Sequence, residues 1–250
     1  MSATVHLVGA GPGAADLLTV RAARLLGEAD IVFYDALVPC EILSLVKTQR
    51  RVAVGKRSGR HATAQRFINK QLVDAARRHR TVVRLKGGDP MLFGRAHEEI
   101  AALQREDIRV EVVPGITAAL AASAELRVSL TRRGAARSVT FVTPRVGEGE
   151  RESTWIQAVL AADTAAIYMG AGEAEAIHAA LIAAGKPADT PVAVVESASL
   201  PSTVHAFGVL GELPSLARSN GGPMLILLGE VYAEAVAARA ERPRRAIHAA

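Results

Sequence analysis

The fold class is decided by residues 82–90, VVRLKGGDP. Two β-branched residues open a strand that runs to Lys86, where two glycines end it. The pair Asp89 and Pro90 predicts a helix start, with Asp89 as the cap and Pro90 at the first helical position. A strand, a glycine turn and a helix in this order are typical of βαβ units, so the stretch predicts an α/β fold with a parallel sheet.

The same pattern extends along the chain in both directions. Strands are expected at residues 5–8, 31–34, 51–54, 82–86 and 109–113, then at 138–142, 165–168, 191–196, 203–208 and 224–228, with a helix over about 173–184. The pair 191–196 and 203–208 lacks a helix-length connection, so part of the second sheet is expected to be antiparallel. With a linker between about 114 and 137, we predict an N-terminal domain at 1–115, a C-terminal domain at 116–240 and a frayed tail at 241–250.

Composition excludes several classes of function. Half of the 250 residues are apolar and 22% are charged, as in a soluble globular protein. Aromatic residues make up 4%, which disfavours single-stranded nucleic-acid binding, and the net charge of +5 is dispersed along the chain. The single cysteine, Cys40, excludes an internal disulfide. We expect a cytoplasmic protein with no membrane span, no nucleic-acid partner and no metal site.

Three glycine-containing loops follow predicted strands of the first half. The first, GAGPG at 9–13, resembles a dinucleotide fingerprint, with Asp35 about twenty residues on, but Pro12 removes a backbone donor and weakens the phosphate cradle. A simple tight turn explains this loop equally well. The others are residues 84–95, which add three basic side chains to the adjacent glycines Gly87 and Gly88, and 112–119, where Thr117 can cap a helix. All three are expected to converge at one edge of the sheet, where α/β proteins bind ligands.

The second half offers two further candidate segments. Residues 129–134, SLTRRG, together with Arg137, group arginines that can hold carboxylates by paired hydrogen bonds; a solvated basic turn is the competing explanation. Residues 168–170 and 196–199 each follow a predicted strand, and the glycine after Met169 suggests backbone exposed at a cleft.

Together these segments resemble the tetrapyrrole methylase family. The resemblance rests on an ordered set that spans nearly the whole chain: residues 8–13, 34–38, 83–95, 113–118, 130–134 and 168–170. The most specific part is RLKGGDP at 84–90. The family implies two α/β domains with S-adenosylmethionine bound in the cleft between them, and a homodimer.

The resemblance also implies roles for individual residues. Donor contacts are expected from Pro12, Gly87, Gly88, Asp89, Leu92, Phe93, Thr117, Ala118, Met169, Ala198 and Met224. Substrate contacts are expected from Arg84, Arg95, Glu98, Arg132 and Arg133, with Arg95 and Glu98 as the catalytic pair. Ala96 and His97 depart from a glycine pair that is usual in the family, and Arg132 stands where histidine is common.

The implied activity is S-adenosylmethionine-dependent C-methylation of a tetrapyrrole, with uroporphyrinogen III converted to precorrin-2 in two steps. Within the family, a later corrin-ring methylase is the alternative, and relatives that act on protein or ribosomal RNA are disfavoured by residues 84–95. A nicotinamide-binding oxidoreductase that uses residues 9–13 and Asp35 is a different hypothesis. A non-catalytic tetrapyrrole carrier is another.

Overall fold

The structure is a computed structural model that describes residues 3–54, 65–146, 153–218 and 221–240. The chain divides into two compact units, the first from Met1 to Ala118 and the second starting at Ala119. The tail predicted at 241–250 lies outside the described residues. No helix of the described chain is both long enough and apolar enough to cross a membrane.

The N-terminal unit contains the predicted parallel sheet. Its strands are β1 (Thr4–Gly9), β2 (Ile31–Tyr34), β3 (Arg51–Ala53), β4 (Thr81–Lys86) and β5 (Arg109–Val113), in the spatial order β3-β2-β4-β1-β5. Every pairing in this sheet is parallel. All five carboxyl-terminal strand ends therefore lie at the same edge.

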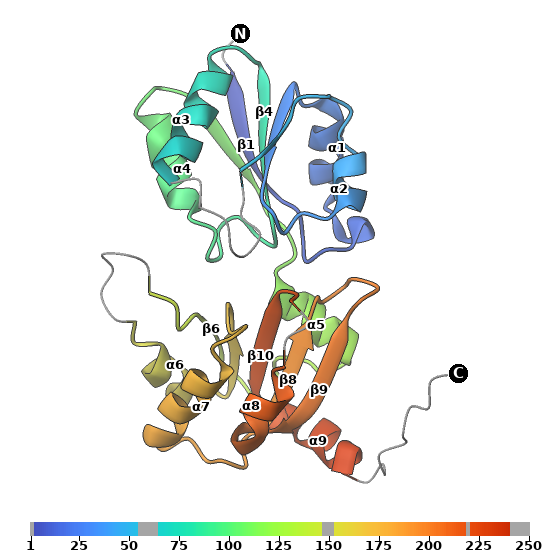
Figure 1. Ribbon diagram of the computed structural model, residues 1–250, viewed down its shortest axis with the longest axis vertical. Coiled ribbons are helices and arrows are strands. Elements are labelled where there is room, and N and C mark those ends of the chain that lie inside the picture. The colour runs from blue at the N-terminus through green and yellow to red at the C-terminus, as the bar shows by residue number, and fades with distance from the viewer. Residues whose placement is uncertain (1–2, 55–64, 147–152, 219–220, 241–250) are drawn as a thin grey trace. The chain divides into compact units, whose positions relative to one another are not determined.

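Helices cover both faces of this sheet (Figure 1). They are α1 (Val20–Glu28) and α2 (Cys40–Ser44) on one face, α3 (Gln65–Ala76) and α4 (Ala96–Gln104) on the other, with a short 3-10 turn, η1, at Ala15–Leu17. Successive strand residues serve opposite faces: Val8 packs with Leu26 of α1, and Leu7 packs with Leu72 of α3. Helix α1 begins at Val20, where the Thr19 side chain accepts the Ala22 N–H.

The C-terminal unit has the predicted mixed sheet. Its strands are β6 (Val139–Val142), β7 (Thr164–Ile167), β8 (Pro191–Glu196), β9 (Val204–Val209) and β10 (Met224–Gly229), in the order β6-β7-β10-β8-β9. The pair β6 and β7 is parallel, whereas β10 and β9 run antiparallel to their neighbours. Each of the ten predicted strands is present, with its ends shifted by at most one residue.

The helices of this unit are α5 (Ala118–Leu126), α6 (Trp155–Ala161), α7 (Ala174–Ala183), α8 (Leu213–Leu216) and α9 (Ala233–Ala240), with 3-10 turns η2 (Leu210–Glu212) and η3 (Glu230–Tyr232). Side chains of α6, α7 and α8 form one core with the sheet, centred on Ile177, Leu181 and Ile226. The predicted helix over 173–184 is α7. The segment predicted as a linker contains α5, whose alanine-rich sequence buries Ala119, Ala121 and Ala122.

Candidate active site

Three loops meet at the carboxyl-terminal edge of the N-terminal sheet. They follow β1, β4 and β5, which are neighbours in the strand order, and contain residues 9–13, 87–88 and 114–115. Gly11 and Gly88 exchange two backbone hydrogen bonds, 3.1 Å from the Gly11 N–H and 2.8 Å from the Gly88 N–H. The convergence expected from the sequence is therefore found in the structure.

Glycine is required at this edge because the three backbones touch. A Cβ on Gly115 would lie 2.3 Å from the Gly88 carbonyl oxygen, and a Cβ on Gly9 would lie 2.6 Å from the Gly115 backbone. At Gly88 a Cβ would meet no atom within 4 Å, but the φ of 66° favours glycine. The edge thus combines closely packed backbone with open space beside Gly88.

Asp89 links two of these loops and does not cap a helix. Its Oδ2 accepts the Gly115 N–H at 2.9 Å, and its Oδ1 accepts the Met91 N–H at 2.8 Å. Because α4 begins only at Ala96, the predictions of Asp89 as the N-cap and Pro90 as the first helical residue are wrong. The chain first turns back on itself over 90–94, where a Cβ on Gly94 would lie 2.5 Å from the Pro90 carbonyl oxygen.

The other predicted donor residues of this unit lie on the same loops. Pro12 is in the loop after β1; Gly87, Leu92 and Phe93 follow β4; Thr117 is buried two residues beyond Gly115, and Ala118 begins α5. They stay predictions as donor contacts.

Arg84 lies inside the unit, although it was predicted to bind substrate. Its side chain is 3% exposed, and its guanidinium pairs with Glu99 at 3.0 Å and with Asp35 at 2.5 Å. Two carboxylates of the protein therefore already neutralise the positive charge of Arg84, which was predicted to bind a carboxylate of the tetrapyrrole. Asp35 uses its Oδ1 in this ion pair, and its side chain is 27% exposed.

Lys86 shares the same buried carboxylate. Its Nζ lies 3.1 Å and 3.0 Å from the two oxygens of Glu99, which is 0% exposed, and Gln65 of α3 donates a further hydrogen bond to Glu99. Burial lowers the pKa of Lys86 below its usual range and the nearby Arg84 lowers it further, while the Glu99 carboxylate opposes both effects. Arg84, Lys86, Asp35 and Glu99 form what we call the buried charge network.

Arg95 and Glu98, the predicted catalytic pair, form a two-pronged ion pair at the start of α4. The distances are 2.7 Å and 2.8 Å, and both side chains are exposed. The hydrogen bond from Arg95 holds the pKa of Glu98 below its usual range. A lower pKa makes Glu98 a weaker proton acceptor than the sequence-based hypothesis assumed, and a substrate carboxylate would have to compete with it for Arg95.

The C-terminal unit brings three predicted donor residues to one edge of its own sheet. Met169 follows β7, Ala198 follows β8, and Met224 begins β10, which lies between those strands and pairs Met224 with Glu196. The β8 loop is fixed to the start of β10, since the Ser197 N–H donates to the Pro223 carbonyl at 2.9 Å and the Glu196 carboxylate accepts the Gly222 N–H at 2.6 Å.

Backbone strain concentrates in these loops. Among the described residues, seven that are not glycine have a left-handed φ, and five of the seven lie in the loops that follow β4, β7 and β8: Phe93, Arg95, Met169, Ser197 and Ser199. Such conformations cost about 1 to 3 kcal/mol each and persist where the surroundings enforce them, commonly at functional sites.

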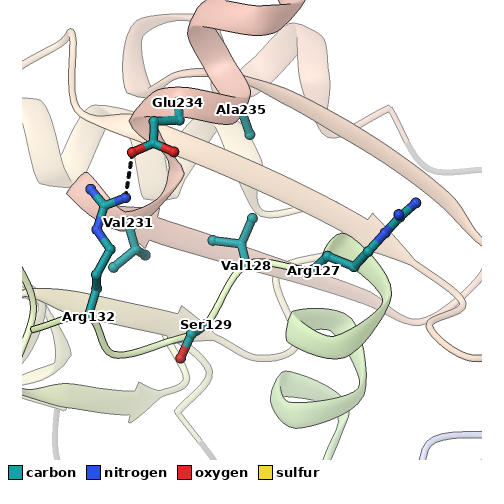
Figure 2. A pocket seen from close by; sticks show the side chains of 7 residues that line it. All are labelled: Arg127, Val128, Ser129, Arg132, Val231, Glu234 and Ala235. Carbon is teal, nitrogen blue, oxygen red and sulfur yellow. Dashed lines mark hydrogen bonds and ion pairs between the residues drawn. The ribbon is translucent and has the colours of Figure 1, made fainter.

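Arg132 and Arg133 lie at the opposite edge of the C-terminal sheet. They precede β6, and Arg137 and Ser138 donate backbone hydrogen bonds to Asp163, just before β7. Arg132 lines a pocket of about 390 Å³ with Arg127, Val231 and Glu234, and it pairs with Glu234 at 2.8 Å. Figure 2 shows these side chains and the ion pair. Within this unit the two arginines are therefore not brought together with Met169, and their role as substrate ligands stays a prediction.

Sequence reasoning missed Glu99, although the signal for it is present. A strand that ends with Arg84 and Lys86 among apolar neighbours needs buried anions, because charged side chains are almost never fully buried without a partner. The adjacent pair Glu98 and Glu99 offered two candidates, and only the orientation of α4 decides which one faces the strand. The described chain contains no cluster of His, Cys, Asp or Glu that could hold a metal ion.

Comparison with known proteins identifies the class. Residues 4–214 match the family of tetrapyrrole (corrin/porphyrin) methylases. The chain belongs to this family.

Individual relatives narrow the comparison. A siroheme synthase of Chromobacterium violaceum is 47% identical over 230 residues, which cover 91% of this chain and 49% of the relative, so the chain spans about half the length of that protein. A crystal structure of uroporphyrin-III C-methyltransferase from Thermus thermophilus, complexed with S-adenosylhomocysteine, is 39% identical with a TM-score of 0.81 and covers 92% of this chain and 99% of that one. A cobalt precorrin-4 methyltransferase is 28% identical with a TM-score of 0.79, covering 91% and 95%.

Proposed function

We propose that this chain transfers methyl groups from S-adenosylmethionine to two ring carbons of uroporphyrinogen III, giving precorrin-2. The observation that carries the proposal is the glycine edge of the N-terminal unit, where residues 9–13, 87–89 and 114–115 pack backbone against backbone and leave open space beside Gly88. The similarity to a methyltransferase that was crystallised with the demethylated donor supports the same assignment.

The donor fits the residues present. The open space beside Gly88 suits a ligand that lies directly against backbone, and Asp89, linked to Gly115, keeps that backbone in place. Bound there, S-adenosylmethionine supplies a methyl group on a positively charged sulfur. The residues that would hold it are Gly87, Gly88, Leu92, Phe93 and Thr117, with Pro12 from the first loop; Ala118, Met169, Ala198 and Met224 are the further donor contacts that we propose.

The protein's contribution to the reaction is positioning. The pyrrole carbons of the substrate are electron-rich enough to attack the methyl group, so no nucleophilic side chain is needed and correct orientation of the substrate accounts for the rate. The new carbon–carbon bond forms as the bond from methyl to sulfur breaks, which releases S-adenosylhomocysteine, and the macrocycle then loses a bridge proton to solvent. Uroporphyrinogen III carries eight carboxylates, which suits a chain with a formal charge of +5. We propose that Arg95 orients one of these carboxylates and that Glu98 controls the direction of its guanidinium.

The test is anaerobic incubation of the full chain with S-adenosylmethionine and fresh uroporphyrinogen III, followed by product mass and S-adenosylhomocysteine release. We expect the mass of two added methyl groups and two equivalents of S-adenosylhomocysteine per macrocycle. If S-adenosylhomocysteine binds and no methyl group is transferred, the substrate assignment is wrong, and the likeness to a cobalt precorrin-4 methyltransferase makes later corrin intermediates the next substrates to assay.

A matched pair of variants tests the role of Arg95. Arg95→Ala is expected to raise the KM for the tetrapyrrole, whereas Arg105→Ala, an exposed arginine at the other end of α4, is expected to leave it unchanged. Native KM and kcat in Arg95→Ala would show that Arg95 does not orient the substrate. The proposed homodimer is checked separately, by light scattering of the purified chain.

A further inference from the structure

We propose that Glu99 is a positioning residue. Its buried carboxylate, on α4, fixes the shape of the donor-binding loop 87–95. It touches neither donor nor substrate in this proposal. It acts through Lys86 and Arg84, the two cations that end β4 directly before that loop.

Glu99 accepts hydrogen bonds from side chains of two different elements, β4 and α3. Its Oε1 accepts hydrogen bonds from Arg84 at 3.0 Å, from Lys86 at 3.1 Å and from Gln65 at 3.2 Å, and its Oε2 accepts a second bond from Lys86 at 3.0 Å. One fully buried side chain on α4 therefore fastens the last residues of β4 and the start of α3 to the same point. Removing it would leave two buried cations without their shared partner.

Lys86 also contacts the loop, at Gly94. A Cβ on Gly94 would lie 3.2 Å from Lys86 Cε, so the Lys86 side chain passes close to the backbone of Gly94, where the turn 90–94 ends. The two oxygens of Glu99 hold the end of that side chain. The loop between Lys86 and Arg95 is thus anchored at its start by β4 and at its end by α4, and the side chain that Glu99 holds lies against it at Gly94.

The buried charge network also extends beyond the loop, to Asp35. Arg84 passes the constraint to Asp35, which follows β2 at the same edge of the sheet and is 27% exposed. Glu98 and Arg95 sit on the same helix turn as Glu99, directly outside it. Movement of Glu99 would therefore shift the loop, the Asp35 carboxylate and the exposed ion pair together.

Loss of stability alone cannot distinguish positioning from packing, so the test pairs two variants of one helix. Glu99→Gln removes the charge with little change in shape. Leu103→Ala removes a fully buried apolar side chain from the far end of α4 and leaves the network intact. Thermal unfolding is used to find a temperature at which both variants are folded, and the affinity for S-adenosylhomocysteine is then measured by calorimetry on the full chain.

We expect Glu99→Gln to weaken S-adenosylhomocysteine binding about tenfold, because displacement of a positioned group by a fraction of an ångström has effects of this order. Leu103→Ala should bind within about twofold of the native chain even if it is the less stable variant. Glu99→Asp, which keeps the charge on a shorter side chain, should recover part of the affinity. Native affinity in Glu99→Gln, or equal losses in Glu99→Gln and Leu103→Ala, would overturn the proposal.

Two further measurements complete the design. If Glu99→Gln does not fold, Lys86→Met takes its place, since it keeps a stem against Gly94 but removes the ammonium that Glu99 holds; unchanged affinity there would also overturn the proposal. The inference rests on the proposed function only for the identity of the donor. The native chain is the reference. If it does not bind S-adenosylhomocysteine, the assignment of the methyl donor is wrong. If it binds S-adenosylhomocysteine but does not methylate uroporphyrinogen III, only the choice of tetrapyrrole is wrong, and the comparison of the variants still holds.

Discussion

The two sheet edges that carry the predicted donor residues are built by different means. In the N-terminal unit, backbone touches backbone at Gly9, Gly88 and Gly115, and the buried charge network lies beneath the loops. In the C-terminal unit, Gly170 faces the end of the Ile226 side chain, which belongs to the apolar core. Backbone and buried charge yield to a substitution only at a high energetic cost, whereas a side chain can change rotamer, so the N-terminal edge is expected to be the less tolerant of the two.

The largest expected effect is on the network itself. Arg84→Met leaves the partly exposed Asp35 carboxylate without its partner and Glu99 with Lys86 as its remaining cation, which should lower the free energy of unfolding by about 3 kcal/mol. Arg77→Met, which breaks an exposed pair with Glu106, should cost no more than about 1 kcal/mol. Urea unfolding of both variants measures the two free energies. Equal losses would show that burial of the charges does not determine how much an ion pair stabilises the fold.

The second-largest expected effect is the difference in stability lost when Gly115 and Gly170 are each replaced by alanine. Gly115→Ala places a Cβ 2.3 Å from a carbonyl oxygen and should cost about 3 kcal/mol, because backbone must move. Gly170→Ala places a Cβ 2.8 Å from Ile226 Cδ1, which can turn aside, and should cost about 1 kcal/mol. Thermal unfolding decides between them, with Gly27→Ala in α1, where only ordinary contacts arise, as the control. A larger loss at Gly170 would contradict the distinction drawn between the edges.

Relief of strain is a smaller effect. Met169 has a φ of 57°, so Met169→Gly should gain about 0.5 kcal/mol in unfolding free energy while weakening donor binding, if the side chain contacts the donor as proposed. Asp107→Gly, at a φ of 54° in the turn after α4, should give a similar gain without any change in S-adenosylhomocysteine affinity. Unchanged affinity in both variants would remove Met169 from the donor site.

The smallest effect concerns the exposed pair of Arg95 and Glu98. The pKa of Glu98 is lowered in the folded chain, so its contribution to stability is present above the ordinary pKa of a glutamate and is lost as the pH falls through the lower pKa of the folded state. Native chain and Glu98→Gln should therefore differ by less than about 1 kcal/mol at pH 6 and converge on acidification. Denaturant unfolding at several pH values measures this, and a difference that grows toward acid would reverse the sign argued here.

Some features of the candidate site followed from local sequence. The glycine loops after β1, β4 and β5 were placed correctly because strand ends and glycines are local signals, and parallel strands bring such loops to one edge. Asp89 was misjudged for an equally local reason. The pair Asp89 and Pro90 satisfies the pattern of a helix start, but Gly94 packs against Pro90 and delays the helix to Ala96.

The sequence by itself determined the α/β class, the ten strands, the division into parallel and mixed sheets and the resemblance to the tetrapyrrole methylases. These depend on periodicity and turn residues, which act over a few positions. Only the tertiary structure decided that Arg84 is buried against Asp35, 49 residues away, that Glu99 rather than Glu98 faces β4, and that Arg132 lies at the edge of its sheet opposite Met169. Partners so distant in sequence are chosen by how helices pack on a sheet, and that choice leaves no periodic trace in the chain.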